Sequence, residues 1–267
     1  MRTQQSSRTY SKFRVSAIAM VTSLAAAVLV LAQPVMAITV IDDFTTGLFE
    51  LTRLSAGTSS GTLGGAGILG GEREVILEWR TGTPGQPASA TVGTKYLASE
   101  PEGLLRWNEA DQIIGSLTLI YDGTDVAGVA PGLGNVDLTN NGQETGIVIG
   151  YWQDGRWKVT INIETWDGAT KLVSTAEFTA VSNGRTPFGT TETAFIPWTA
   201  FVGSANGSAN PASVDAIVFT FDSALAGGGG DYEFNFLASS VPEPVTMAGM
   251  FLGLAGLGRY VRRRRMA

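Results

Sequence analysis

Apolar and polar residues alternate through most of the chain between residues 38 and 240. A period of two with one apolar face predicts half-buried strands of antiparallel sheets. The clearest alternating runs lie at residues 75–80, 159–164, 217–222 and 232–237. Weaker runs predict further strands at about 38–43, 48–54, 90–97, 112–121, 145–152, 170–181 and 192–197. No helix of ten residues or more is expected between Ile38 and Ser240.

The segments between these runs have the composition of turns and loops. Gly57 to Gly71 is rich in glycine, serine and threonine, and we expect it to be a connector. Asp154-Gly155 predicts a tight hairpin that joins the strand ending near Trp152 to the strand beginning near Trp157. About ten strands at this spacing predict an all-β fold, an antiparallel β-sandwich of the jelly-roll type.

Residues 1–37 have the organisation of a secretory signal peptide. Basic residues without any acidic residue precede a nearly unbroken apolar stretch, Val15 to Leu31. Val35-Met36-Ala37 then places small residues at the two positions that signal peptidase reads, so we expect cleavage after Ala37. The alternative is an uncleaved N-terminal anchor. The basic residues are Arg2, Arg8, Lys12 and Arg14.

A second apolar stretch lies at the other end of the sequence. It runs for 14 residues from Val245 to Gly258, or for 17 if it extends to Val261. As a helix it would cover about 21–26 Å of a hydrocarbon core about 30 Å thick, which is marginal for a permanent transmembrane helix. The arginines that follow should stay cytoplasmic, which would place residues 38–240 outside the cytoplasmic membrane. These arginines are Arg259, Arg262, Arg263, Arg264 and Arg265.

Val241-Pro242-Glu243-Pro244 immediately precedes this stretch, and its two prolines favour an extended backbone around Glu243. The short motif, the apolar helix and the arginine tail resemble a PEP-CTERM sorting signal in order and spacing. The resemblance implies that a membrane-embedded exosortase recognises Pro242, Glu243 and Pro244 and processes the chain near them, usually in the setting of exopolysaccharide or biofilm formation. The expected organisation is a signal peptide at 1–37, an exported domain at 38–240 and a sorting signal at 241–267.

Removal of both ends changes the charge of the chain. The sequence has 18 basic and 24 acidic residues, but four basic residues precede residue 38 and five follow residue 240. The exported part therefore has nine basic residues against 24 acidic ones, counting Glu243, and a net charge near −15. Such a domain should be soluble and should not bind nucleic acid or anionic membranes, whereas divalent cations can bridge it to acidic polymers.

The chain contains no cysteine and no histidine. Disulfides and thiolate metal sites are therefore excluded, and so are the commonest general base, Ser-His and Cys-His pairs, and the usual zinc ligand. A glycosidase needs two carboxylates about 5–10 Å apart across a cleft, and the sequence does not single out such a pair. We expect a protein that is not an enzyme, with a polysaccharide-active enzyme as an alternative.

Several short phrases in the exported part occur in a characteristic order. They are Ile41-Asp42-Asp43-Phe44, residues 68–74, Ile196-Pro197-Trp198, residues 214–219 and Asp231-Tyr232-Glu233-Phe234. This order resembles the galactose-binding-like jelly rolls that serve as carbohydrate-binding modules. It also resembles exported domains that often precede PEP-CTERM signals. The resemblance implies a glycan or exopolysaccharide ligand.

Three tryptophans are candidate ligand contacts, because sugar rings stack on exposed aromatic faces. Trp152 and Trp157 flank the expected hairpin, and Trp166 precedes another turn, Asp167-Gly168. The alternative for each tryptophan is packing in the hydrophobic core.

Four acidic residues are candidate ligands of a structural calcium ion, which prefers six to eight oxygen atoms. Asp42 and Asp43 lie near the first expected strand, and Asp231 and Glu233 lie near the last. They would meet if these two strands were neighbours, and the jelly-roll resemblance implies a calcium site in that region. The alternative is a solvated acidic edge, and no other cofactor is expected.

The expected protein is an exported, exosortase-processed component of the cell surface or extracellular matrix that binds polysaccharide. Its expected partners are signal peptidase, exosortase and an extracellular polysaccharide, with a transient anchor in the inner membrane. A purely structural coat or biofilm protein without a small ligand is an alternative.

Overall fold

A computed structural model of the chain describes residues 38–46, 49–92, 103–124, 132–181 and 191–240, all of which belong to the unit Ile38–Ala267. Within these ranges the only helical elements are three 3₁₀ turns, and none of them has the length or apolar character of a membrane-spanning helix. Ala37 and the expected sorting signal at 241–267 lie outside the described residues, so they remain predictions. The 3₁₀ turns are Leu69–Gly71, Trp198–Ala200 and Ala224–Ala226.

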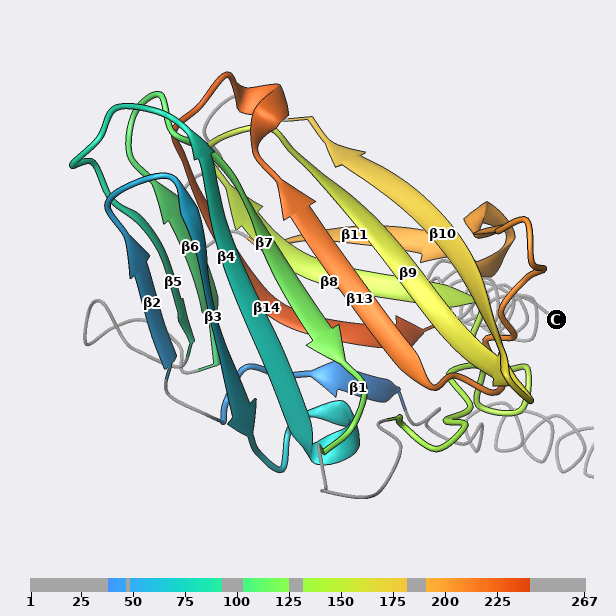
Figure 1. The fold of residues 1–267 in the computed structure, drawn as a ribbon. Coiled ribbons are helices and arrows are strands. Elements are labelled where there is room, and N and C mark those ends of the chain that lie inside the picture. Colours follow the sequence, from blue (N-terminus) through green and yellow to red (C-terminus); the bar gives the residue numbers. More distant parts are fainter. Residues whose placement is uncertain (1–37, 47–48, 93–102, 125–131, 182–190, 241–267) are drawn as a thin grey trace, which may run out of the picture. The chain divides into compact units, whose positions relative to one another are not determined.

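The described chain is otherwise built of β-strands (Figure 1). Their bounds, in chain order, are β1 (Thr39–Asp42), β2 (Phe49–Arg53), β3 (Gly57–Gly64), β4 (Glu72–Thr81), β5 (Ala88–Val92), β6 (Leu105–Glu109), β7 (Ile114–Tyr121), β8 (Gly146–Gln153), β9 (Trp157–Asp167), β10 (Thr170–Ala180), β11 (Glu192–Pro197), β12 (Val202–Gly203), β13 (Ala216–Asp222) and β14 (Gly230–Ser240).

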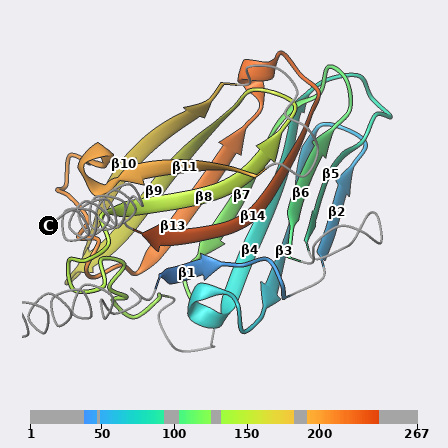
Figure 2. The ribbon, with the colours of Figure 1, turned by 180° about the vertical axis from the view of Figure 1, so that it is seen from behind.

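These strands form two antiparallel sheets that pack face to face as a sandwich. Sheet A has the order β11-β8-β14-β6-β5-β2, and β1 pairs with β14 beside this path. Sheet B has the order β12-β10-β9-β13-β7-β4-β3. Figure 1 shows sheet B in front, and Figure 2 shows sheet A from the opposite side. The expectation of an all-β sandwich is therefore confirmed.

The core between the sheets is aromatic. Trp157 of sheet B is fully buried, and its ring contacts Tyr151 and Phe234 of sheet A at centroid distances of 5.0 and 5.5 Å. Phe221 of sheet B and Phe234 of sheet A lie 4.3 Å apart. Burial of such rings dominates the energetics of a core, so these contacts hold the two sheets together.

A buried polar cluster ties β1 to sheet B. The Asp42 carboxylate of β1 forms an ion pair with Arg73 of β4, and neither side chain is exposed. The Tyr121 hydroxyl donates to Asp42 Oδ2 at 2.8 Å, and the Phe44 amide donates to Oδ1 at 2.8 Å. The Arg73 guanidinium also lies 5.5 Å from the centre of the Phe44 ring. These partners offset part of the cost of burying both charges, but burial still raises the pKa of Asp42.

One predicted connector contains a strand, β3, and one strand, β6, was not predicted. Gly57–Gly64, expected as part of a loop, is strand β3 and pairs with β4 from Gly57 opposite Trp79 to Gly64 opposite Glu72. This edge strand contains only one large apolar residue, Leu63, so its glycine-rich sequence shows no alternation of apolar and polar residues. Leu105–Glu109 forms β6, which was not predicted because its alternation contains only two apolar residues, Leu105 and Trp107.

The expected hairpin at Asp154-Gly155 is wrong. β8 pairs with β14 and β11 in sheet A, whereas β9 pairs with β10 and β13 in sheet B, so the turn crosses from one sheet to the other. Its Asp154 amide donates to the Asp231 carbonyl at 3.1 Å, and the Asp231 amide donates to Asp154 Oδ1 at 3.0 Å. The tight hairpin is instead the β9–β10 connection, where Asp167 pairs with Thr170 and Gly168 has a φ of +62°.

Candidate functional site

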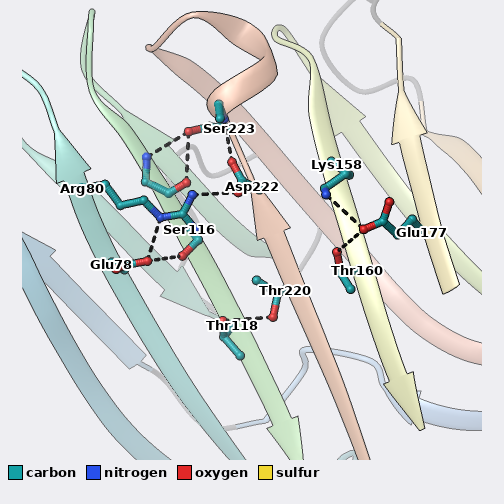
Figure 3. A network of polar contacts seen from close by, with 12 residues as sticks. Glu78, Arg80, Ser116, Thr118, Lys158, Thr160, Glu177, Thr220, Asp222 and Ser223 are labelled. Carbon is teal, nitrogen blue, oxygen red and sulfur yellow. Dashed lines mark hydrogen bonds and ion pairs between the residues drawn. The ribbon is translucent and has the colours of Figure 1, made fainter. Parts of the chain in front are cut away.

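The outer face of sheet B is the candidate functional surface of the described residues. Val159, Ile161 and Ile163 of β9 are buried in the core, so the residues between them point away from it. This alternation places Lys158, Thr160, Asn162, Glu164 and Trp166 on the outer face. The neighbouring strands add further polar side chains in register with them (Figure 3).

One polar network crosses β4, β7 and β13. Arg80 Nε lies 2.8 Å from Glu78 Oε2, and Arg80 Nη1 lies 2.7 Å from Asp222 Oδ2. The Ser116 hydroxyl also donates to Glu78 Oε2 at 3.0 Å. The hydrogen bond from Arg80 lowers the pKa of Glu78. Burial opposes ionisation of Asp222, but hydrogen bonds from Arg80 and from the Ala224 amide outweigh it and lower the pKa of Asp222.

A second group of polar side chains crosses β9 and β10. Lys158 Nζ lies 3.1 Å from Glu177 Oε1, as Figure 3 shows, and Lys171 Nζ lies 2.6 Å from Glu164 Oε2. The Thr175 hydroxyl donates to Asn162 Oδ1 at 2.7 Å. Each of these carboxylates therefore has a cationic neighbour on the same face, which fixes the position of its oxygen atoms.

Trp166 is the aromatic side chain of this face, and half of its surface is exposed. It pairs across the hairpin with Lys171, and its backbone amide donates to Asp215 Oδ2 at 2.9 Å. The preceding residue is also fixed, because the Thr165 hydroxyl donates to the Ser213 carbonyl at 2.9 Å. An anchored backbone thus holds an exposed indole at the end of a polar surface.

The other two candidate tryptophans are buried. Trp157 is 0% exposed and lies at the centre of the core, so the prediction that it contacts a ligand is wrong. Trp152 is 6% exposed and lies on sheet A, opposite Glu233 of β14. Neither residue lies on the outer face of sheet B with Trp166. Alternation could have separated Trp157 from Trp166, because they are an odd number of residues apart along one strand.

The candidate calcium ligands do not come together. β1 and β14 are neighbours as expected, but Asp42 lies opposite Leu237, far along β14 from Asp231 and Glu233. The Asp42 carboxylate is occupied by Arg73, and Glu233 Oε1 lies 2.9 Å from Arg106 Nε. Asp43 Oδ1 accepts hydrogen bonds from the Thr45 amide and hydroxyl at 2.9 and 2.7 Å. The described residues contain no group of three or more acidic side chains placed to hold a metal ion.

One unusual carboxyl group was not predicted. Glu109 of β6 is 5% exposed, and neither of its carboxyl oxygens has a hydrogen-bond partner. The Ser223 hydroxyl and the Gly115 amide lie close enough to favour its charged form, but they bond to each other instead. Burial is the main cause that raises the pKa of Glu109 to about 7. Alternation could have indicated this position, because Leu105, Trp107 and Glu109 share one side of β6, but the sequence alone gives no reason to place a carboxyl group in the core.

Comparisons with known proteins find remote similarity to solved structures. No family model and no curated protein matches the chain. Among solved structures, it is similar to a family 11 carbohydrate-binding module of the cellulase Lic26A-Cel5E of Clostridium thermocellum, with 13% identity over 78% of this chain and 98% of that one, at a TM-score of 0.36. A family 30 carbohydrate-binding module of Cel9D-Cel44B from the same organism has 12% identity over 72% and 98%, at a TM-score of 0.35.

A metagenome-derived family 12 endoglucanase is also similar, with 11% identity over 73% of this chain and 99% of that one, at a TM-score of 0.30. Binding modules and a hydrolase thus occur among the similar structures. At these identities and scores, the likeness does not assign a function to the chain.

Proposed function

We propose that residues 38–240 form a polysaccharide-binding domain without catalytic activity, and that the outer face of sheet B is its binding surface. The observation that carries this proposal is the half-exposed Trp166 at the end of an ordered polar face. A sugar ring has an apolar face that stacks on an indole, and its hydroxyls need fixed donors and acceptors. The ion-paired carboxylates and the hydroxyls of β9 and β10 supply such groups.

The charge of the domain favours a neutral polysaccharide. The exported part has a net charge near −15, which repels an acidic polymer. On the outer face of sheet B, Arg80, Lys158 and Lys171 already neutralise neighbouring carboxylates. A neutral glycan therefore binds without electrostatic repulsion from the domain, whereas an acidic glycan needs a bridging divalent cation such as calcium.

The test is binding of neutral and acidic polysaccharides to residues 38–240, with and without calcium, first on a glycan array and then by calorimetry. Trp166→Ala should weaken binding of the neutral ligand at least about tenfold, because buried tryptophan contacts dominate interfaces, and Trp166→Phe should retain part of it. Leu225→Ala is the matched control, since Leu225 is equally exposed at 50% but lies in the turn Ala224–Ala226. The proposal fails if no glycan binds or if Trp166→Ala binds normally, and hydrolysis of a bound glycan would contradict a role without catalysis.

We propose further that the domain is exported and sorted to the cell surface or extracellular matrix. The support is the pattern of the two ends, with small residues before the bond after Ala37 and the motif Pro242-Glu243-Pro244 before an apolar stretch. Replacement of Pro242 or Pro244 with alanine should leave an unprocessed, membrane-bound species in the native host. Unchanged processing of both variants on a gel would contradict recognition by exosortase.

A further inference from the structure

The edges of the two sheets differ in how they are protected. An exposed edge offers unpaired N–H and C=O groups to another strand, and proteins usually block it with charges, proline, bulges or short strands. In sheet A, edge strand β2 carries Glu50 and Arg53, and edge strand β11 carries Glu192 and Pro197. On one side of sheet B, β12 has only two residues, and the adjacent β10 carries Lys171 and Glu177.

The fourth edge strand, β3, carries no charge, proline or bulge of its own. Charged neighbours do lie beside it, because Arg53 of β2 donates to Ser59 Oγ at 3.4 Å, and Glu74 and Glu78 of β4 lie opposite Thr62 and Thr58. β3 is eight residues long, Gly57-Thr-Ser-Ser-Gly-Thr-Leu-Gly64, and its pairing with β4 continues without a register shift. Its side chains alternate between half-buried and exposed positions, with Thr58, Ser60 and Thr62 on the outer face. Among the described strands, β4 is the one that pairs with β3, so no described strand pairs with the other side of β3.

We propose that the β3 edge is a docking surface for a second copy of this chain, which pairs its own β3 antiparallel to the first. A twofold interface requires a surface that complements itself. If Ser60 lies opposite Ser60 of the other copy, Thr58 lies opposite Thr62, and all these hydroxyls fall on the same outer face. The opposite side of the strand then pairs Gly57 with Leu63 and Ser59 with Gly61, so the small residues leave room for the larger one.

Charge favours this edge over other surfaces for contact between two copies. Each exported part has a net charge near −15, so most approaches bring like charges together. β3 itself is uncharged, whereas Glu78 and Glu74 of β4 lie opposite its Thr58 and Thr62. Salt that screens the repulsion between the glutamates of the two copies should strengthen the pairing. The pairing would join two copies of sheet B into one continuous sheet and place two copies of Trp166 on the same extended surface, so it goes beyond the function of a single domain.

The absence of cysteine from the chain allows a direct test. In Ser60→Cys the introduced thiols of the two copies face each other, because directly opposed residues have Cβ atoms about 4.5–5.5 Å apart, close to the range that a disulfide needs. The full chain is purified in mild detergent, oxidised in about 1 M salt and analysed on a non-reducing gel. Ser60→Cys should form a cross-linked dimer at least about tenfold faster than Thr58→Cys, which faces Thr62 and not itself.

Two controls separate this register from other contacts. Thr220→Cys places a thiol on the outer face of sheet B between β7 and β9, away from the edge, and should not cross-link. A mixture of Thr58→Cys and Thr62→Cys, one of them carrying a size tag, should give the mixed dimer. Thermal unfolding of each variant confirms that it is folded. Equal rates for Ser60→Cys, Thr58→Cys and Thr220→Cys, or no cross-link in folded Ser60→Cys, would overturn the proposal.

Discussion

Replacement of Glu109 with glutamine should remove a pH dependence from the stability of the sandwich. Glu109 is 5% exposed, its carboxyl oxygens have no hydrogen-bond partner, and burial is the main cause that raises its pKa to about 7. A buried carboxylate without partners is costly, so the folded state holds the proton more tightly than the unfolded state. Glutamine has nearly the same shape and cannot ionise.

The sign of the effect follows from the two proton affinities. Below about pH 4.5 both states carry the proton, and Glu109 costs nothing through ionisation. Between about pH 4.5 and 7 the unfolded state releases the proton first, so the free energy of unfolding falls as the pH rises. One pKa unit corresponds to about 1.4 kcal/mol, so a rise from 4.5 to about 7 corresponds to about 3 kcal/mol. This cost is fully present above pH 7.

The measurement is the difference in unfolding free energy between Glu109→Gln and the unchanged protein, from urea titrations of residues 38–240 followed by tryptophan fluorescence at several pH values. A buried amide without partners costs about 1–3 kcal/mol by itself, but that cost does not depend on pH. The unfolding free energy of Glu109→Gln, relative to that of the unchanged protein, should therefore rise by about 3 kcal/mol between pH 4 and pH 8.

Glu177→Gln is the matched control for this experiment. It removes a carboxylate whose side chain is 59% exposed and whose partner is Lys158 on the surface. Exposed pairs contribute about 0–1 kcal/mol, so this variant should change stability little at any pH. A difference for Glu109→Gln that stays constant from pH 4 to pH 8 would refute the reasoning, because it would mean that Glu109 keeps an ordinary proton affinity in the folded state.

Two further substitutions test the architecture. Arg73→Met should lower the free energy of unfolding by about 3–5 kcal/mol in urea titrations, because it leaves the Asp42 carboxylate buried without its cation. A loss below about 1 kcal/mol would contradict the claim that the buried Asp42–Arg73 ion pair stabilises the fold. Gly228→Ala should lower the melting temperature, because Gly228 has a φ of +97° and an added Cβ would lie 2.7 Å from Gln112 Cα. Gly85 has a similar φ of +89° but no atom within 4 Å of an added Cβ, so Gly85→Ala measures the backbone strain alone. Equal melting temperatures for the two variants would contradict a steric clash between residue 228 and Gln112.

The sequence predicted those elements whose pattern is local. Val75, Leu77 and Trp79 point inward along β4, as their spacing of two residues indicates. β3 escaped prediction, because glycine, serine and threonine at an edge carry no apolar periodicity. The alternation of apolar and polar residues therefore identifies a strand whose side chains fill the core. It does not identify a strand that joins the sheet mainly through backbone hydrogen bonds.

Pairing between distant strands could not be predicted from local sequence. The turn residues Asp154-Gly155 indicate a change of direction, but whether the chain returns in the same sheet depends on the partners of β8 and β9. The candidate calcium site failed for the same reason, since Asp42 is opposite Leu237 and not opposite Asp231. The exposure of Trp166 was predictable, because its position relative to Val159 and Ile163 in β9 fixes its side of the sheet.

The position of β14 in sheet A has a consequence for how the chain reaches its folded state. β14 is the last described strand, yet it pairs with β8, β6 and β1, and Thr39 at the start of β1 lies opposite Ser239. During synthesis from the N-terminus, β1 must wait without its strand partner until about 200 further residues have been made, and β6 and β8 also precede their shared neighbour β14. Completion of sheet A is therefore a late step in folding, because it requires the last described strand of the chain.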